Sequence, residues 1–227
     1  MQYLDYITSA IENDIVSGYP GLTSNLRLSR EQLEDDVIDE RLTIIKEYAI
    51  KGILPNKDLW MSINCLEVDC KPIEKCSICT PSSFKQTDIA HVEIPQIVTS
   101  IGNEAVEYFG SIDRNVPFTV YTDISYQYHQ YNRAIGKKPY VYIDTTPNEN
   151  NFYDCYIFNA PLLKTVSIIA IFKDPRQLLD FTCCNGEELF NFNSLTNDIK
   201  RRVTEKKVRW YRQYQYPPTN NDQTMKP

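Results

Sequence analysis

The chain has 227 residues, of which 42% are hydrophobic and 24% charged, and its formal net charge at pH 7 is -6. This length suits one large domain, or a domain with arms, that buries a core without disulfides or metals to hold it. The acidic balance argues against general nucleic-acid binding, and no run approaches the ~18 apolar residues of a membrane span. The first residues lack the basic and apolar regions of a secretory signal peptide, so we expect a protein of a reducing cytosol.

Two helices are predicted in the N-terminal segment, residues 1–55. The first covers residues 3–17, where apolar residues recur at spacings of three or four along one stripe: Leu4, Ile7, Ile11 and Ile15. The second begins after Ser29, which is placed to form a capping box with Gln32, and Gly52 stands where this helix would close. Its core-facing stripe is predicted to consist of Leu33, Val37, Ile38, Leu42, Ile45, Tyr48 and Ala49.

A β-rich core is predicted over residues 56–190. Short runs of β-branched and aromatic residues indicate strands at 60–68, 91–98, 105–113, 115–123, 140–144 and 152–158. Pro95 interrupts one run and favours an edge or a bend there. The continuous run "TVSIIAIF", residues 165–172, indicates a buried central strand. Residues 125–134 lack a period of two, which favours a helix.

The C-terminal segment, residues 191–227, is predicted to hold a third helix followed by an extended arm. Leu195, Ile199 and Val203 mark a narrow apolar side of that helix. The arm contains two adjacent prolines and few apolar residues, so we expect it to order only against another surface. The whole chain is thus predicted to be one α+β structural unit, with an antiparallel β-meander or sandwich-like part, N-terminal helices, and a C-terminal helix plus arm.

Four of the seven cysteines fall within fifteen residues, in the stretch "CLEVDCKPIEKCSIC". Cys65, Cys70, Cys76 and Cys79 could form a zinc cage, disulfides, or free thiols that pack as small hydrophobic groups. One pair has the C-x2-C spacing of a zinc site, but the other pair is more widely spaced. We favour free packing thiols and expect no metal and no cofactor, with a zinc-stabilised binding module as the alternative.

No familiar catalytic or nucleotide-binding motif occurs in the sequence. The two histidines, His91 and His129, are expected to be hydrogen-bonded structural residues rather than bases. The acidic run "EDDVIDE", Glu34 to Glu40, is expected to form a solvated helix face rather than a metal cluster. We therefore predict no catalytic residue and no enzyme, and a hydrolase is the less favoured alternative.

Charge is distributed unevenly along the chain. Residues 1–50 carry ten acidic and four basic side chains, whereas residues 194–227 carry three acidic and eight basic ones. Aromatic residues interleave with the bases of the third helix, a pattern compatible with a solvated helix, a subunit interface or contact with DNA. The candidate residues for a subunit interface or a DNA channel are Lys200, Arg201, Arg202, Lys207, Arg209, Trp210 and Arg212.

Several blocks of the sequence resemble a structural protein of crAss-like bacteriophages, a group of short-tailed phages. The blocks are "CLEVDC", "HVEIPQIVTSIGNEAVEYFGSIDRNVPF", "YHQYNRAIGKKPYVYIDTTPNE", "YDCYIFNAPLL" and "IFKDPRQL". The similarity as a whole runs from about Glu31 to Asp180, two thirds of the chain. The matching family is a ring protein of the head-to-tail connector.

This resemblance implies a virion protein, assembled in the host cytoplasm, that forms a closed and typically twelve-fold ring below the portal. Such a ring extends the DNA channel used in ejection and provides a surface for tail attachment. The implied partners are copies of the chain, the portal, and other connector and tail proteins, with no membrane partner. Genomic DNA would pass without sequence-specific binding, which agrees with the acidic net charge. A zinc-stabilised, phage-encoded binding module is the alternative function.

Overall fold

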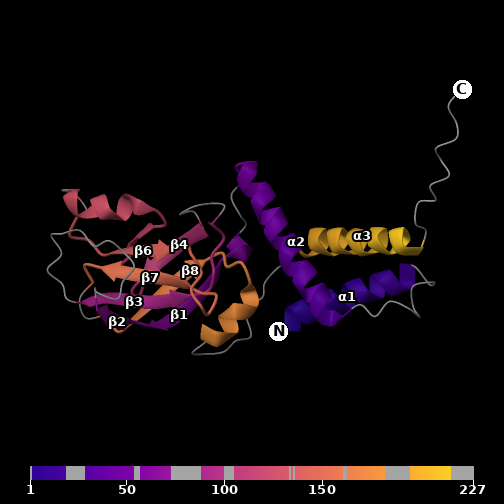
Figure 1. Cartoon of the computed structure of the whole chain (residues 1–227), viewed down its shortest axis with the longest axis horizontal. Helices are drawn as coiled ribbons and strands as arrows, with labels where there is room; N and C mark the ends of the chain where they lie inside the picture. Colours follow the sequence, from indigo (N-terminus) through magenta and orange to yellow (C-terminus); the bar gives the residue numbers. More distant parts are fainter. Residues whose placement is uncertain are drawn as a thin grey trace, which may run out of the picture. The chain divides into compact units, whose positions relative to one another are not determined.

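The computed structural model describes residues 2–18, 29–53, 57–72, 88–99, 105–132, 134, 136–160, 163–181 and 195–215. The chain is α+β, as predicted: helices near both ends enclose a β-rich middle in the sequence (Figure 1). Two compact units emerge from its internal contacts. One, the helical unit, consists of Met1–Glu47 and Phe190–Pro227, and the other, the β unit, of Tyr48–Leu189.

The helical unit contains α1 (Gln2–Gly18), most of α2 (Arg30–Ile50) and α3 (Thr196–Gln215). Helix α1 buries the predicted stripe and packs against α3. The buried residues of these two helices are Leu4, Ile7, Thr8, Ile11 and Ile15 in α1, and Ile199, Val203 and Val208 in α3, with Leu195 just before it. The apolar periodicity of the sequence is therefore confirmed for both helices.

Helix α2 buries a somewhat different stripe from the one predicted. Ile44 is buried while Leu42 is only half-buried, and the fully buried Arg41 interrupts the apolar surface. The end of α2 is as predicted: Gly52 has φ 66°, its N–H donates to Ala49 O, and the N–H of Ile53 donates to Tyr48 O at 2.9 Å. This pair of bonds is a Schellman closure, which requires a left-handed residue that glycine adopts without strain.

The β unit is a sandwich of two sheets (Figure 1). The three-stranded sheet has the order β1 (Met61–Glu67), β8 (Thr165–Ala170), β4 (Val106–Gly110), and all its pairs are antiparallel. The five-stranded sheet has the order β2 (Asp69–Pro72), β3 (Asp88–Ile94), β7 (Tyr153–Phe158), β6 (Tyr140–Asp144), β5 (Thr119–Tyr121). Its β5–β6 pair is parallel, which departs from the purely antiparallel prediction.

One apolar cluster lies between the two sheets. It includes Ile63 and Ile168 from the smaller sheet together with Val92, Val141 and Ile157 from the larger one. Strand β8 is central, as the run "TVSIIAIF" indicates, and β3 ends at Ile94, directly before the bend-forming Pro95. Burial of both inner faces therefore stabilises the sandwich through the hydrophobic effect.

The outer face of the larger sheet carries a second, aromatic cluster. The helix expected near residues 125–134 is a short 3-10 helix, η5 (Ile124–Tyr131), which places Tyr126 against Tyr142, with ring centroids 4.3 Å apart. Tyr140 stacks on Phe158 at 4.7 Å. The remaining described 3-10 helices are η2 (Lys57–Leu59) and η6 (Pro175–Phe181). No described helix is long and apolar enough to cross a membrane.

Candidate subunit-contact site on the C-terminal helix

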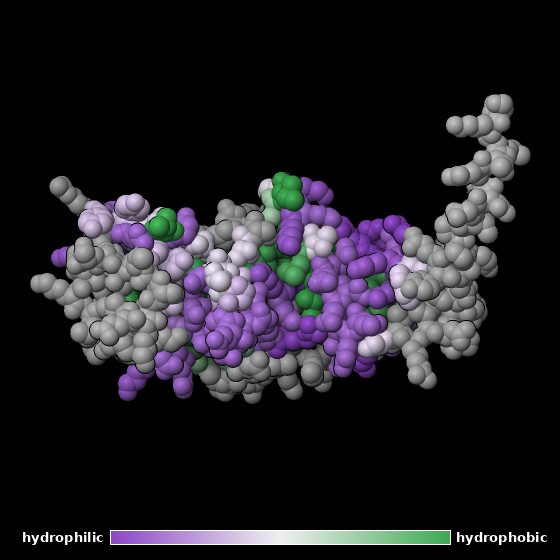
Figure 2. Space-filling view, viewed as in Figure 1, coloured by the Kyte–Doolittle hydropathy of each residue, from purple (hydrophilic) through white to green (hydrophobic). Residues whose placement is uncertain are grey.

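Helix α3 combines a few buried apolar residues with many basic ones. Ile199, Val203 and Val208 are buried at spacings of four and five residues, and the basic residues occupy the remaining positions. Because an α-helix has 3.6 residues per turn, Ile199 and Val203 lie on one side of α3 and Val208 lies on the opposite side, so different turns of α3 bury different sides. The candidate cations whose side chains the structure describes are half-buried or exposed, and the surface over the helices is largely hydrophilic (Figure 2).

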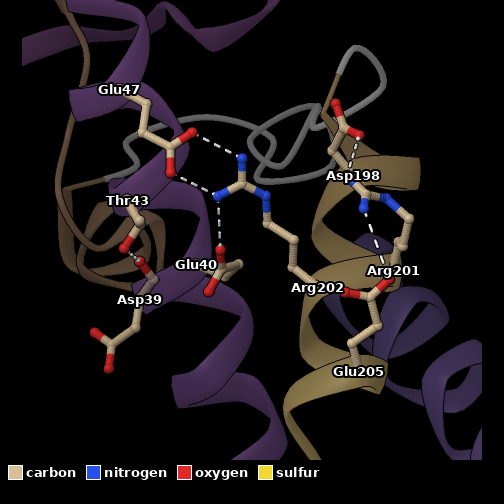
Figure 3. A network of polar contacts seen from close by, with 8 residues as sticks. All are labelled: Asp39, Glu40, Thr43, Glu47, Asp198, Arg201, Arg202 and Glu205. Carbon is tan, nitrogen blue, oxygen red and sulfur yellow. Dashed lines mark hydrogen bonds and ion pairs between the residues drawn. The ribbon is translucent and has the colours of Figure 1, made fainter. Parts of the chain in front are cut away.

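Arg202 reaches across to α2 and binds two carboxylates. Its guanidinium donates to both oxygens of Glu47, at 2.8 and 2.7 Å, and to Glu40 at 3.1 Å (Figure 3). The pKa of Arg202 is raised, mainly by its hydrogen bonds to Glu47. Slight burial lowers the pKa, but the hydrogen bonds to Glu47 and Glu40 outweigh it. Such a bidentate pair is directional as well as ionic, so Arg202 ties α3 to α2.

A second cluster on the same two helices is centred on Asp36. Lys206 donates to Asp36 at 2.9 Å, and Lys207 forms an ion pair with the other oxygen of the same carboxylate. Partial burial raises the pKa of Asp36, but the hydrogen bonds and charges of Lys207 and Lys206 outweigh it, so the net pKa is lowered. Lys200 forms a longer contact, 3.7 Å, with Asp14 of α1.

The outer side of α3 carries the cations that do not bind α2. Arg201 points away from α2, and among the residues that the structure describes it forms ion pairs with Asp198 and Glu205 of its own helix, at 3.5 and 3.6 Å (Figure 3). Its side chain is 60% exposed. Arg209 is exposed and makes no ion pair with any residue the structure describes, and Trp210 is 48% exposed. The side chain of Arg212 lies outside the described part.

The structure therefore divides the predicted contact residues into two sets. Lys200, Arg202 and Lys207 are bound to acids of the same subunit, whereas Arg201, Arg209 and Trp210 are exposed. The opposite charges of the two chain ends thus meet within one subunit. An interface role for the exposed set is still a prediction.

The interpretation of "EDDVIDE" as a solvated face is wrong for two of its residues. The side chains of Asp36 and Glu40 are only 15% and 16% exposed, because Lys206, Lys207 and Arg202 cover them. A signal for this pairing was present in the sequence. Acids recur four apart at Asp36 and Glu40, and bases recur four apart at Arg202 and Lys206, a spacing that places each pair on one helix face.

The cysteine cluster is only partly described. Cys65 in β1 is disulfide-bonded, so it is not available as a thiolate for a four-cysteine zinc cage, and the expectation that it is a free thiol is wrong. Cys70 in β2 is a free and exposed thiol, and Cys155 in β7 is free and buried. Burial, with the negative charges of Asp154 and Asp144, raises the pKa of the Cys155 thiol. Cys76, Cys79, Cys183 and Cys184 lie outside the described residues.

Both histidines have structural partners, as predicted. The Tyr121 hydroxyl lies 2.8 Å from His129 Nδ1, and the His129 ring stacks on Tyr140 with centroids 4.2 Å apart. His91 Nε2 lies 2.5 Å from Asp154 Oδ1, and its ring packs near Tyr156. Both imidazoles are buried in the aromatic side of the β unit.

Comparison with known proteins gives one family. A family model described as phage tail ring protein 2, of the crAss ring type, matches residues 11–225. The match therefore includes both the helical unit and the β unit. No match is found among curated proteins.

Proposed function

Because the chain belongs to the crAss phage tail ring protein 2 family, we propose that its copies close into a ring in the head-to-tail connector, below the portal. Membership makes it a structural component of the phage tail and hence of the virion. The family match over residues 11–225 is the observation that carries this proposal, because it extends over nearly the whole chain. The role we propose is mechanical, with no catalytic step.

The exposed part of α3 is the surface that we propose for contact between copies. A ring made of one kind of subunit needs two unlike patches that complement each other, one on each side. Arg201 and Arg209, both exposed and about 80° apart around the helix axis, form one candidate patch, since arginine is enriched in interface cores. The exposed Trp210 is a candidate contact on another side of α3. Lys200, Arg202 and Lys207 would instead hold α3 in the orientation that presents this patch.

We further propose that the ring extends the channel for genomic DNA and provides attachment for the portal and other tail proteins. A chain with net charge -6 repels phosphate overall, so DNA would pass without binding tightly. Twelve-fold symmetry is the expectation from the resemblance described above. The acidic charge supports passage of DNA and gives no reason for sequence-specific binding.

The proposal is tested by charge reversal on the exposed side of α3. We expect the double variant Arg201→Glu/Arg209→Glu to reduce the amount of this chain in purified tails at least about tenfold, because each lost contact of ~1.4 kcal/mol changes an equilibrium tenfold. The matched control reverses the exposed cations Lys137 and Lys138 of the β unit. Circular dichroism of both purified variants should match the unmodified chain.

Normal incorporation of the Arg201→Glu/Arg209→Glu variant, with a normal ring by electron microscopy, would reject this surface as the interface. Arg202 is left unchanged in this test, because its reversal would place a third acid beside Glu40 and Glu47 and disturb folding. If this chain forms no ring in purified tails, whether unmodified or substituted, the proposal of a ring is itself rejected.

A further inference from the structure

We propose that His91, Glu93 and Asp154 form a binding site for one divalent transition-metal ion, a property that the ring role does not require. The imidazole nitrogen and the two carboxylate oxygens all lie within 4.8 Å of one another. They come from neighbouring antiparallel strands: His91 and Glu93 from β3, and Asp154 from β7.

Strand register explains why these side chains meet. Glu93 is directly opposite Asp154, and His91 is directly opposite Tyr156. Residues two apart on a strand share a face, and residues directly opposite in a ladder share that face too. All three groups therefore lie on the outer, aromatic face of the larger sheet, on the side away from the apolar core.

Negative charge accumulates at this end of the sheet. Asp144 of β6 is directly opposite Asp154, so Glu93, Asp154 and Asp144 form a row across three strands. Like charges directly opposite in a ladder are destabilising. Neither Glu93 nor Asp144 makes an ion pair with a lysine or arginine among the described residues. A bound cation would neutralise this row.

The donor set is suited to a transition metal. Imidazole nitrogen with carboxylate oxygen is a combination that Zn²⁺ and related ions accept, at about 2.0–2.2 Å from each ligand. Two ligands on one ion are then at most about 4.4 Å apart, so small side-chain rotations would bring the three atoms into range. His91 is only 2% exposed, whereas Glu93 and Asp154 are half-buried and reachable from solvent.

Neighbouring groups already orient the ligands. The Asn148 side chain donates to Glu93 Oε1 at 3.2 Å, and the His91 ring packs against Tyr156 with centroids 5.3 Å apart. Partners of this kind hold metal ligands in place and raise affinity. His91 Nε2 already faces Asp154 at 2.5 Å, so the ion would insert between two groups that are in contact.

The test is zinc titration of the purified, metal-free full chain by calorimetry and native mass spectrometry. We expect the unmodified chain to bind one Zn²⁺ ion at this site. The affinity for that ion should be about tenfold or more weaker in Glu93→Gln, and binding should be lost in His91→Ala. Glu149→Gln, an exposed acid in the adjacent turn, is the matched control and should bind as the unmodified chain does. Glu93→Gln keeps the shape of the side chain, so it tests the site even if His91→Ala fails to fold.

Cobalt distinguishes this site from the cysteines. With Co²⁺ bound, we expect visible d–d bands without the near-ultraviolet band of a cobalt–thiolate bond. The proposal is overturned if no ion binds, if Glu93→Gln binds as tightly as the unmodified chain, or if the cobalt spectrum shows thiolate ligation. Metal binding is read on the isolated chain, so this result is independent of whether the chain forms a ring.

Discussion

The two units of this chain are stabilised by different forces. The helical unit joins α3 to α2 through ion pairs around Arg202 and Asp36, on the flanks of a narrow apolar seam. The β unit has a continuous apolar core between two sheets and an aromatic cluster on its outer face. Burial of apolar area is strong and is not screened by ions, while partly exposed ion pairs are weaker and are screened by salt. We therefore expect salt concentration to change the stability of the helical unit more than that of the β unit.

The largest effect is expected from a cavity in the β unit. Phe158 is 1% exposed and stacks on Tyr140. Phe158→Ala should cost about 3–5 kcal/mol of unfolding free energy, because the loss of buried area is followed by incomplete collapse of the cavity. Denaturant titration measures the loss of unfolding free energy. Hydrogen exchange should show that amide protection is lost in the strands of the larger sheet. An effect below ~1 kcal/mol would mean that the aromatic cluster is not tightly packed.

Alkaline pH should also weaken the β unit selectively. Burial, followed by the nearby Tyr126 and Tyr121, raises the pKa of Tyr140 to about 12. Because the folded pKa is above the unfolded value near 10, the stability contributed by the neutral phenol is complete below pH ~10 and is lost as pH rises toward ~12, about 3 kcal/mol in all.

The matched variant for this test is Tyr140→Phe, which cannot ionise and should remove this part of the alkaline loss. Tyrosinate absorbance and unfolding free energy are measured together between neutral and alkaline pH. An equal alkaline loss in both chains would show that Tyr140 is not the group responsible.

Arg202→Ala should destabilise the helical unit by ~1–2 kcal/mol, less than the cavity in the β unit. The arginine is 29% exposed, which limits the electrostatic contribution, but its removal leaves Glu40 and Glu47 close together without their cation. Arg201→Ala is the matched control, with an expected change under ~0.5 kcal/mol because its pairs are exposed and within one helix. Equal effects of the two substitutions would contradict the division of α3 into inner and outer cations.

The smallest effect concerns Asp36 at acidic pH. Although burial opposes it, pairing with Lys207 and Lys206 lowers the pKa of Asp36. A carboxyl with a lowered folded pKa stabilises the fold above its unfolded pKa of about 4 and loses that contribution as pH falls through the folded pKa. Asp36→Asn should therefore cost less than ~1 kcal/mol near neutral pH, and the difference from the unmodified chain should shrink below pH ~4. A difference that is independent of pH and of salt would indicate a packing effect instead.

Local patterns in the sequence predicted most of the fold but not its long-range pairings. The stripe from Leu4 to Ile15, the Gly52 closure and the central strand 165–170 follow from spacing and from the properties of single residues. The parallel β5–β6 pair did not follow, because strand direction depends on how the connecting chain travels in three dimensions. No local feature of the sequence that we used shows which strands pair with one another.

The same limit explains the candidate site. The basic character of α3 was evident from the sequence, but which bases are covered depends on the rotation of α3 against α2. Arg201 and Arg202 are adjacent in sequence and yet face opposite ways, one outward and one toward Glu47 (Figure 3). Similarly, His91 and Asp154 are far apart in sequence and meet only because β3 pairs with β7.

Site-specific photo-cross-linking in assembled tails tests the central claim most directly. A photoreactive amino acid replaces Arg209 on the exposed side of α3, and in a control it replaces Lys137 of the β unit. If the outer side of α3 contacts a neighbouring copy, irradiation of the Arg209 variant should give a covalent adduct of two copies of this chain. Adducts of the Arg209 variant to DNA alone, or no adduct while the chain is fully incorporated into tails, would contradict the account.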